Sequence, residues 1–392
     1  MKIVVYLIVF VLVMSIITNN QTKTEAKEEP SVQNLQWSPD GKQVVFVEDL
    51  DKGNQAIMIA NSDGTNIWQL TFVNAATIID CVLWSYDSKY LLVGTSGGSG
   101  IDLKLFELSS KKTKDIEALL KPLKMSFASW STPSWSPDSK QITFGGRVKD
   151  GEVHLLILDI NSDNLRDLTN EFNLPLDLEE INPDWSKDGK QLLFILSHYS
   201  HIDYATHARL YLANIDGSGL KAIWPADGES NHSISYAKWS PDNKLILIQG
   251  SHEETENKII PPGMPDVFIL DVETLKLKTI KPDSKPWPKL NATWSPDGTK
   301  IAFMDLIPYP VNYGVDTDFF IYVLAIHDDN FSFEEAIQIA SPVNSNHYAW
   351  SPDGKQITYD LGISGGDNTH FSIYVVNVDG SYTHTFHFDW KD

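Results

Sequence analysis

The chain has 392 residues, 42% of them hydrophobic and 21% charged, so it is neither disordered nor too short to bury one large β domain or two ordinary domains. Its 52 acidic and 31 basic residues give a formal net charge of −21, which repels a phosphate backbone and argues against nucleic-acid binding. A single cysteine, Cys81, excludes an internal disulfide, a cysteine-based zinc cluster and a redox pair.

The first predicted element is a targeting segment. Lys2 precedes an apolar run of residues 3–17, and the polar stretch TNNQTKTEAKEEP follows that run. A positive start, a short apolar run and a polar tail are typical of a secretory signal peptide, which we predict over residues 1–26. Because a membrane span needs about 20 apolar residues, an uncleaved anchor that tethers the chain through residues 3–17 is the alternative. Both alternatives predict an exported protein of the periplasm, the cell surface or the extracellular space.

The rest of the chain repeats one motif, Trp-Ser-x-Asp, seven times. Proline occupies the variable position in five copies, and Gly, Ser or Asn follows the aspartate, as is typical of a tight turn. Repetition at a period of about 50 residues indicates a repeat architecture. The motif tryptophans are Trp37, Trp84, Trp135, Trp185, Trp239, Trp294 and Trp350.

Each repeat contains the pattern of four antiparallel strands, which we call A to D. Seven and nine residues after each tryptophan the side chain is apolar or aromatic, as in Val44 and Phe46, and this period of two predicts a strand with one packed face. A second turn, such as Asp63-Gly64, separates the last two strands. Four strands repeated seven times predict an all-β fold, a seven-bladed β-propeller over residues 31–390. The expected blades span residues 31–73, 78–116, 129–168, 181–224, 234–280, 290–340 and 346–388.

The WSPDGKQ-type repeat and the strand IYVVNVDG (residues 373–380) resemble the WD-like repeat of TolB-type propellers. They are also similar to the propeller domains of prolyl oligopeptidase-type peptidases. The sequence departs from both families, because it shows no α/β domain before the repeats and no hydrolase domain after them. The resemblance therefore implies the fold, and it implies neither the partners of TolB nor peptidase activity.

We expect each motif tryptophan to pack between neighbouring blades and not to bind a ligand, because every blade has one. The A–B and C–D turns are short and share one face of a propeller, which we call the short-turn face. The B–C and D–A connections share the other, which we call the loop face, and the long B–C loops are expected at residues 197–208, 250–265, 305–317 and 360–370. Variable loops on a rigid scaffold are a usual binding surface.

The candidate binding residues on the loop face are His198, Tyr199, His201, Tyr204, His207, His232, His252, Glu253, Tyr309, Tyr313, His347 and His370. Imidazoles and carboxylates are ligands for divalent metals, and a similar seven-bladed oligogalacturonate lyase has a histidine-based metal site. Because no histidine pair has the spacing of a compact metal motif, we predict no cofactor, with a divalent metal as the alternative. No catalytic residue is assigned.

Two other patterns have ordinary structural interpretations. Gly94-Thr95-Ser96-Gly97-Gly98 matches G-x-S-x-G, but it lies between two predicted strands, whereas a nucleophile elbow joins a strand to a helix. Residues 111–124 contain five lysines, which form either a solvated face or a docking patch for an acidic partner.

The favoured hypothesis is a non-enzymatic, monomeric propeller that binds an envelope or extracellular protein, or a cell-wall glycan, through its loop face. The alternative is a carbohydrate-active lyase or hydrolase with a His/carboxylate site at the mouth of the central channel.

Overall fold

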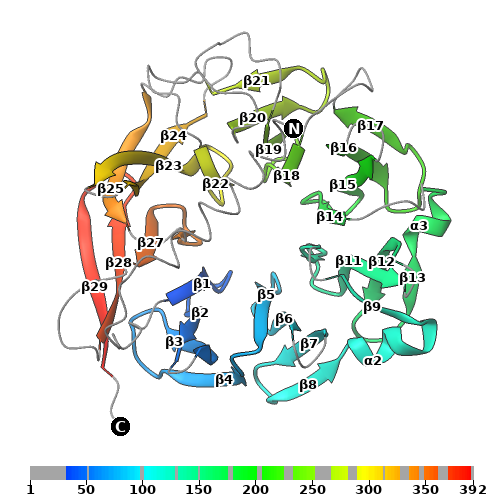
Figure 1. The fold of residues 1–392 in the computed structure, drawn as a ribbon, viewed down its shortest axis with the longest axis horizontal. Coiled ribbons are helices and arrows are strands. Elements are labelled where there is room, and N and C mark those ends of the chain that lie inside the picture. The colour runs from blue at the N-terminus through cyan, green and yellow to red at the C-terminus, as the bar shows by residue number, and fades with distance from the viewer. Residues whose placement is uncertain are drawn as a thin grey trace.

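The computed structural model describes residues 32–50, 53–97, 101–128, 131–148, 151–174, 180–200, 205–224, 233–251, 266–280, 289–311, 314–326, 335–343, 348–360 and 370–389. These residues form a ring of seven sheets, each made of four consecutive antiparallel strands, with β9 added to the third sheet. The first strand of each sheet lies nearest the centre of the ring and the fourth lies outermost (Figure 1). The chain is therefore a seven-bladed β-propeller, as the repeat predicts.

The strands of blades 1 to 3 are β1 (Val32–Trp37), β2 (Gln43–Asp49), β3 (Gln55–Asn61), β4 (Trp68–Val73); β5 (Thr77–Trp84), β6 (Tyr90–Gly97), β7 (Asp102–Glu107), β8 (Lys112–Asp115); and β9 (Met125–Phe127), β10 (Ser134–Trp135), β11 (Gln141–Val148), β12 (Val153–Asp159), β13 (Leu165–Asp167). The short helices are α2 (Glu117–Leu120), the 3₁₀ turn η2 (Lys121–Leu123) and α3 (Leu168–Glu171).

The strands of blades 4 to 7 are β14 (Glu180–Trp185), β15 (Gln191–Ser200), β16 (Ala205–Asn214), β17 (Lys221–Trp224); β18 (Ser233–Trp239), β19 (Leu245–Ser251), β20 (Asp266–Asp271), β21 (Leu277–Thr279); β22 (Lys289–Trp294), β23 (Lys300–Val311), β24 (Gly314–Ala325), β25 (Ile337–Val343); and β26 (Tyr348–Trp350), β27 (Gln356–Asp360), β28 (His370–Asn377), β29 (Tyr382–Asp389).

The core consists of the apolar seams between neighbouring blades. Buried residues of two adjacent blades form each cluster; one cluster, for example, joins Leu210 of blade 4 to Trp239 and Phe268 of blade 5. The motif tryptophans of blades 2 to 7 are 4–8% exposed, and the indole of Trp185 donates to Thr143 Oγ1 of the preceding blade at 2.7 Å. Each seam thus buries a large aromatic surface, which the repeat supplies at a fixed position.

Among the described residues, blades 7 and 1 share no strand, and side-chain contacts close the ring between them. All four strands of each of these blades come from one continuous stretch of the chain. Trp37 Nε1 donates to Thr358 Oγ1 at 2.9 Å, in the same way as at the internal seam of Trp185. A Cβ atom on Gly41 would lie 3.8 Å from Pro352 Cγ, so the turns of blades 1 and 7 also touch.

The conserved serine and aspartate of the repeat build the A–B turn. In blade 6, Ser295 Oγ donates to Asp297 Oδ1 at 2.6 Å and accepts the backbone N–H of Lys300 at 2.9 Å. Partial burial works to raise the pKa of Asp297, but hydrogen bonds from Ser295 and Thr299 lower that pKa to about 2. The same serine–aspartate bond is present in all seven blades, at 2.6–2.8 Å.

We expect replacement of this serine to destabilise the chain measurably. Ser295 is fully buried, and Ser295→Ala leaves the Lys300 N–H without its acceptor, at a cost of about 1–2 kcal/mol in the free energy of unfolding. Ser235→Ala is the matched control, because Ser235 is exposed, and it should cost less than about 0.5 kcal/mol. Urea titration measures the free energy of unfolding of both variants. Equal losses in the two variants would show that the Ser295 hydrogen bonds do not stabilise the chain.

The expected B–C loops at residues 197–208 and 305–317 were wrong for most of their length. Strands β15 and β16 continue to Ser200 and from Ala205, and β23 and β24 continue to Val311 and from Gly314. The strand-forming residues Ile307, Tyr309, Val311 and Val315 favour this extension. Prolines at 308 and 310 do not prevent it, because proline is tolerated at a strand edge that has no neighbour.

The predicted signal or anchor, residues 1–26, lies outside the described residues. Within the described part of the chain, no helix is long and apolar enough to cross a membrane.

Candidate functional site

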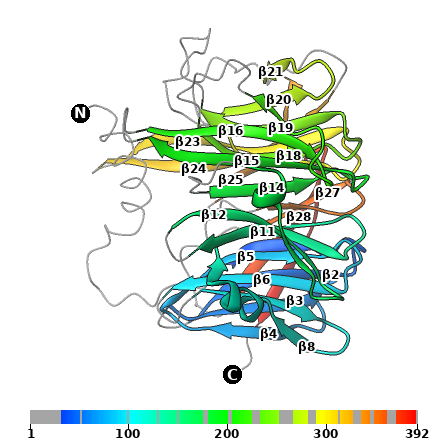
Figure 2. The same cartoon turned by 90° about the vertical axis from the view of Figure 1, so that its right-hand side faces the viewer.

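The loop face carries two projecting β-hairpins. The ladder between β15 and β16 has 10 residue pairs and that between β23 and β24 has 12, whereas the B–C ladders of the other five blades have 5 to 7. Figure 2 shows β23 and β24 reaching beyond the other blades on one side of the ring. Blades 4 and 6 therefore present regular, hydrogen-bonded structure where the sequence predicted loops.

The backbones of five predicted binding residues are placed by these strands and by β28. His198 and Tyr199 lie on β15, and His198 pairs directly with His207 on β16. Tyr309 lies on β23, and His370 begins β28. The side chains of these five lie outside the described part of the structure, as do the whole residues His201, Tyr204, His232, His252, Glu253, Tyr313 and His347. Their convergence into one site stays a prediction.

A buried ionic group supports the loop face between blades 5 and 6. Lys289, the first residue of β22, is 2% exposed, and its cross-strand partner Asp305 is 3% exposed. Asp266, the first residue of β20, is also buried; burial raises the pKa of its carboxyl, and the charge of Lys289 works against that rise. One lysine therefore offsets the negative charge of carboxylates from both blades, at the point where β20 and β22 leave the loop face.

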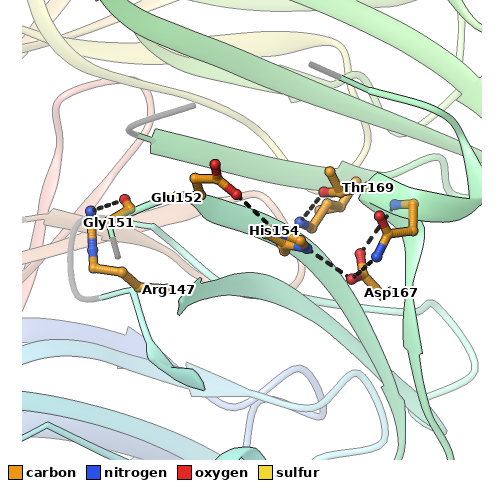
Figure 3. Close-up of polar contacts among 8 residues, drawn as sticks. Arg147, Gly151, Glu152, His154, Asp167 and Thr169 are labelled. Carbon is orange, nitrogen blue, oxygen red and sulfur yellow. Dashed lines mark hydrogen bonds and ion pairs between the residues drawn. The ribbon is translucent and has the colours of Figure 1, made fainter. Parts of the chain in front are cut away.

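A second polar group lies at the loop-face edge of blade 3, as Figure 3 shows. Nδ1 of the buried His154 is 2.8 Å from Asp167 Oδ2, and Nε2 is 3.9 Å from Glu152 Oε2. Asp167 is itself fixed, because its Oδ1 accepts the backbone N–H of Asn170 at the start of α3. Thr169 Oγ1 accepts the backbone N–H of Leu155 at 2.7 Å and so ties α3 to β12.

The arrangement of His154 holds an imidazole in one orientation between two carboxylates. The imidazole is 7% exposed and so has little access to a ligand. His154 is not among the binding residues predicted from the sequence. The available signal was a histidine near the start of the strand VHLLILD, whose next residues, 155–158, include no other polar side chain.

A third polar cluster joins the inner strands of blades 3, 4 and 5. Asp184 Oδ1 is 2.9 Å from Lys238 Nζ, and Asp184 Oδ2 accepts the backbone N–H of Trp239 at 2.9 Å. Ser134 of blade 3 lies 3.4 Å from the same carboxylate. Both oxygens of Asp184 are thus occupied, and the cluster ties three neighbouring blades together.

The two turns that lack the repeat proline meet beside this cluster. Tyr86 and Lys187 occupy the proline position in blades 2 and 4, and Lys187 Nζ lies 4.5 Å from the centroid of the Tyr86 ring. Burial and the nearby charge of Asp184 raise the pKa of Tyr86 to about 12. Tyr86 of blade 2 and Lys187 of blade 4 therefore meet across blade 3, which lies between them in the ring. Both replace the repeat proline, and this shared departure from the repeat is visible in the sequence.

The G-x-S-x-G match forms no nucleophile elbow. Ser96 lies in strand β6, the next element is strand β7, and Ser96 Oγ donates to Asp80 Oδ1 at 2.9 Å. Among the described residues, no group of three or more His, Cys, Asp or Glu side chains is placed to hold a metal ion. Because the predicted histidine side chains lie outside that set, the alternative of a divalent metal remains untested.

Comparison with known proteins agrees with the fold and leaves the activity open. No family model matches the chain. Among curated proteins, the uncharacterized peptidase YuxL of Bacillus subtilis is 25% identical over 161 residues, which are 40% of this chain and 20% of YuxL. This chain therefore matches only about a fifth of the length of that relative.

Solved structures match over almost the whole chain. An oligogalacturonate lyase in complex with manganese is 13% identical, with a TM-score of 0.63, and the match covers 91% of this chain and 95% of the lyase. The β-propeller domain of the Trilobed protease from Pyrococcus furiosus is 14% identical, with a TM-score of 0.59 and coverage of 94% and 97%. TolB from Acinetobacter baumannii also matches, at 13% identity, a TM-score of 0.46 and coverage of 88% and 78%. At these identities the similarity concerns the fold.

Proposed function

We propose that this chain is an exported binding propeller that recognises a protein partner of the cell envelope through its loop face. The observation that carries the proposal is the projection of the β15–β16 and β23–β24 hairpins from blades 4 and 6. A rigid scaffold that presents extended structure on one face is a usual arrangement for recognition. The apolar segment of residues 3–17 supports placement in the envelope.

The edges of the two hairpins supply a physical basis for recognition. Within the described part of the chain, the pairing of β15 with β14 ends at Ser197, and that of β24 with β25 ends at Phe319 towards the tip. Unpaired strand edges offer backbone donors and acceptors to an extended segment of another protein. At the base of the β23–β24 hairpin, the buried Asp305 is paired across strands with the buried Lys289.

A second candidate function is that of a polysaccharide lyase. The supporting observation is the match in fold to an oligogalacturonate lyase bound to manganese. Purified protein incubated with Mn²⁺ and a polygalacturonate panel should then produce unsaturated, ultraviolet-absorbing ends. Absence of both bound metal and turnover would reject this candidate.

Shortening the hairpins tests the binding proposal. One variant replaces residues 198–207 with a two-residue Asn-Gly turn, and a second replaces residues 307–318 in the same way; both remove only the projecting parts of their ladders. We expect each variant to keep the melting temperature within a few degrees and to lose at least tenfold in capture of the wild-type partner from envelope extracts.

The control is Ser218→Asn in the C–D turn of blade 4, on the opposite face of the same sheet. This control should capture the partner as the wild type does. Equal capture by the shortened variants and the wild type would reject the loop face as the binding surface.

A further inference from the structure

We propose that a pocket on the short-turn face, between blades 1 and 2, binds an anionic saccharide. The pocket has a volume of about 470 Å³ and is lined by Gln43, Trp68, Ser88, Lys89, Leu108, Ser109 and Lys111. It lies on the face opposite the hairpins, because it is built from the A–B turns and C–D turns. It is therefore independent of the proposed partner surface.

The charge of the lining differs from that of the chain as a whole. The chain carries 52 acidic residues and a net charge of −21, yet the pocket lining holds two lysines and no carboxylate. Lys89 is held by Asp87, with Nζ 2.9 Å from Oδ2. Lys111 forms no ion pair with any described residue, so its ammonium can pair with an acidic group on a ligand.

Trp68 supplies an aromatic platform in this pocket. The other described tryptophan outside the repeat, Trp224, is buried at 6% exposure, whereas Trp68 at the start of β4 is partly exposed. Its indole packs against the seam between blades 1 and 2, which fixes the ring. A partly exposed indole face that packing holds in place suits the apolar C–H face of a sugar ring.

Lys111 and Ser88 are placed for the remaining contacts. Lys111 Nζ lies 5.5 Å from the centroid of the Trp68 ring, so the cation and the platform serve one small ligand. Ser88 Oγ accepts the backbone N–H of Asp40 at 3.0 Å and therefore keeps its own proton for a sugar hydroxyl. Platform, cation and hydroxyl donor together fit a sugar that bears a carboxylate or another acidic substituent.

Lys111 also sits over the indole in the free protein. A ligand must displace this cation–π contact, and that loss reduces the net affinity. We therefore expect weak binding that becomes weaker still as salt screens the lysine charge.

Isothermal titration of the full chain with a hyaluronan tetrasaccharide tests the proposal, with chitotetraose as the uncharged control. We expect saturable binding of the hyaluronan probe, at least tenfold weaker binding in 0.5 M salt, and no saturable binding of chitotetraose. Trp68→Leu should abolish binding, and Lys111→Asn should weaken it at least tenfold. Asparagine suits this position because Lys111 has a φ of 55°.

The control variant is Lys355→Asn, which changes an exposed lysine on the same short-turn face, in the A–B turn of blade 7, far from the pocket, and should bind as the wild type does. The hairpin-shortened variants should also bind the tetrasaccharide normally, so failure here is distinguishable from failure of the loop-face proposal. No heat with hyaluronan, equal binding of the two sugars, or unchanged binding by both Trp68→Leu and Lys111→Asn would overturn the proposal.

Discussion

Lys289→Met should destabilise the propeller by about 3–5 kcal/mol, because it leaves the buried carboxyls of Asp266 and Asp305 without their compensating charge. Methionine keeps the length and most of the volume of lysine, so the loss reports charge more than packing. Lys355→Met is the matched control: Lys355 has a side-chain exposure of 79%, and its loss should cost less than about 0.5 kcal/mol. Urea unfolding at neutral pH measures both variants.

A triple variant distinguishes the effect of uncompensated charge from the effect of altered packing at this site. Adding Asp266→Asn and Asp305→Asn to Lys289→Met removes the uncompensated charges, and we expect it to recover part of the lost free energy of unfolding. A loss below about 1 kcal/mol for Lys289→Met alone would show that the group does not support the seam between blades 5 and 6.

Acidification from pH 4 to pH 2 should lower the stability of the folded chain steeply. Eleven turn aspartates have lowered pKa values, that of Asp297 to about 2, mainly because turn hydroxyls and backbone N–H groups bond the ionised carboxylate. A carboxyl with a lowered folded-state pKa binds fewer protons in the folded state than in the unfolded state. Its stabilisation is therefore complete above the unfolded value of 3.8 and is lost as the pH falls through the folded value.

Among the described residues, two buried carboxyls and one half-buried carboxyl act in the opposite direction. Burial raises the pKa values of Asp80, Glu117 and Asp266. Their contribution to the stability of the folded chain is therefore lost as the pH rises through their folded-state pKa values. The eleven turn aspartates outnumber them, and the net slope of stability against pH between 2 and 4 should be positive. Urea unfolding at half-unit pH intervals measures this slope, and Asp297→Asn should reduce it. A flat or negative slope in the wild type would contradict this assignment.

The fold was predictable because its determinants are local and repeated. Each Trp-Ser-x-Asp copy specifies a turn through Ser and Asp bonds within five residues, and each tryptophan marks an inter-blade seam. The extents of β15, β16, β23 and β24 were not predicted. Histidines and prolines near a strand end look like loop residues, and only the pairing of the two strands reveals that the ladder continues.

The polar groups below the loop face were harder to predict than the blades. Lys289 and Asp305 are opposite each other only because of the register between β22 and β23, and Asp266 comes from a different blade. His154 and Asp167 lie 13 positions apart and meet because β12 and β13 are adjacent. The contact between Tyr86 and Lys187 is different, since both residues replace the repeat proline and could have been found by aligning the seven turns.

Site-specific photo-crosslinking in living cells tests the central claim, recognition through the hairpins, most directly. A photoreactive residue is placed at position 206 or 315 on the hairpins, and at Ser218 or Ser381 in the short turns of blades 4 and 7. We expect one discrete adduct of the same mass from both hairpin positions and none from the two turn positions. Adducts only from the turn positions, or no adduct from either hairpin, would contradict the claim.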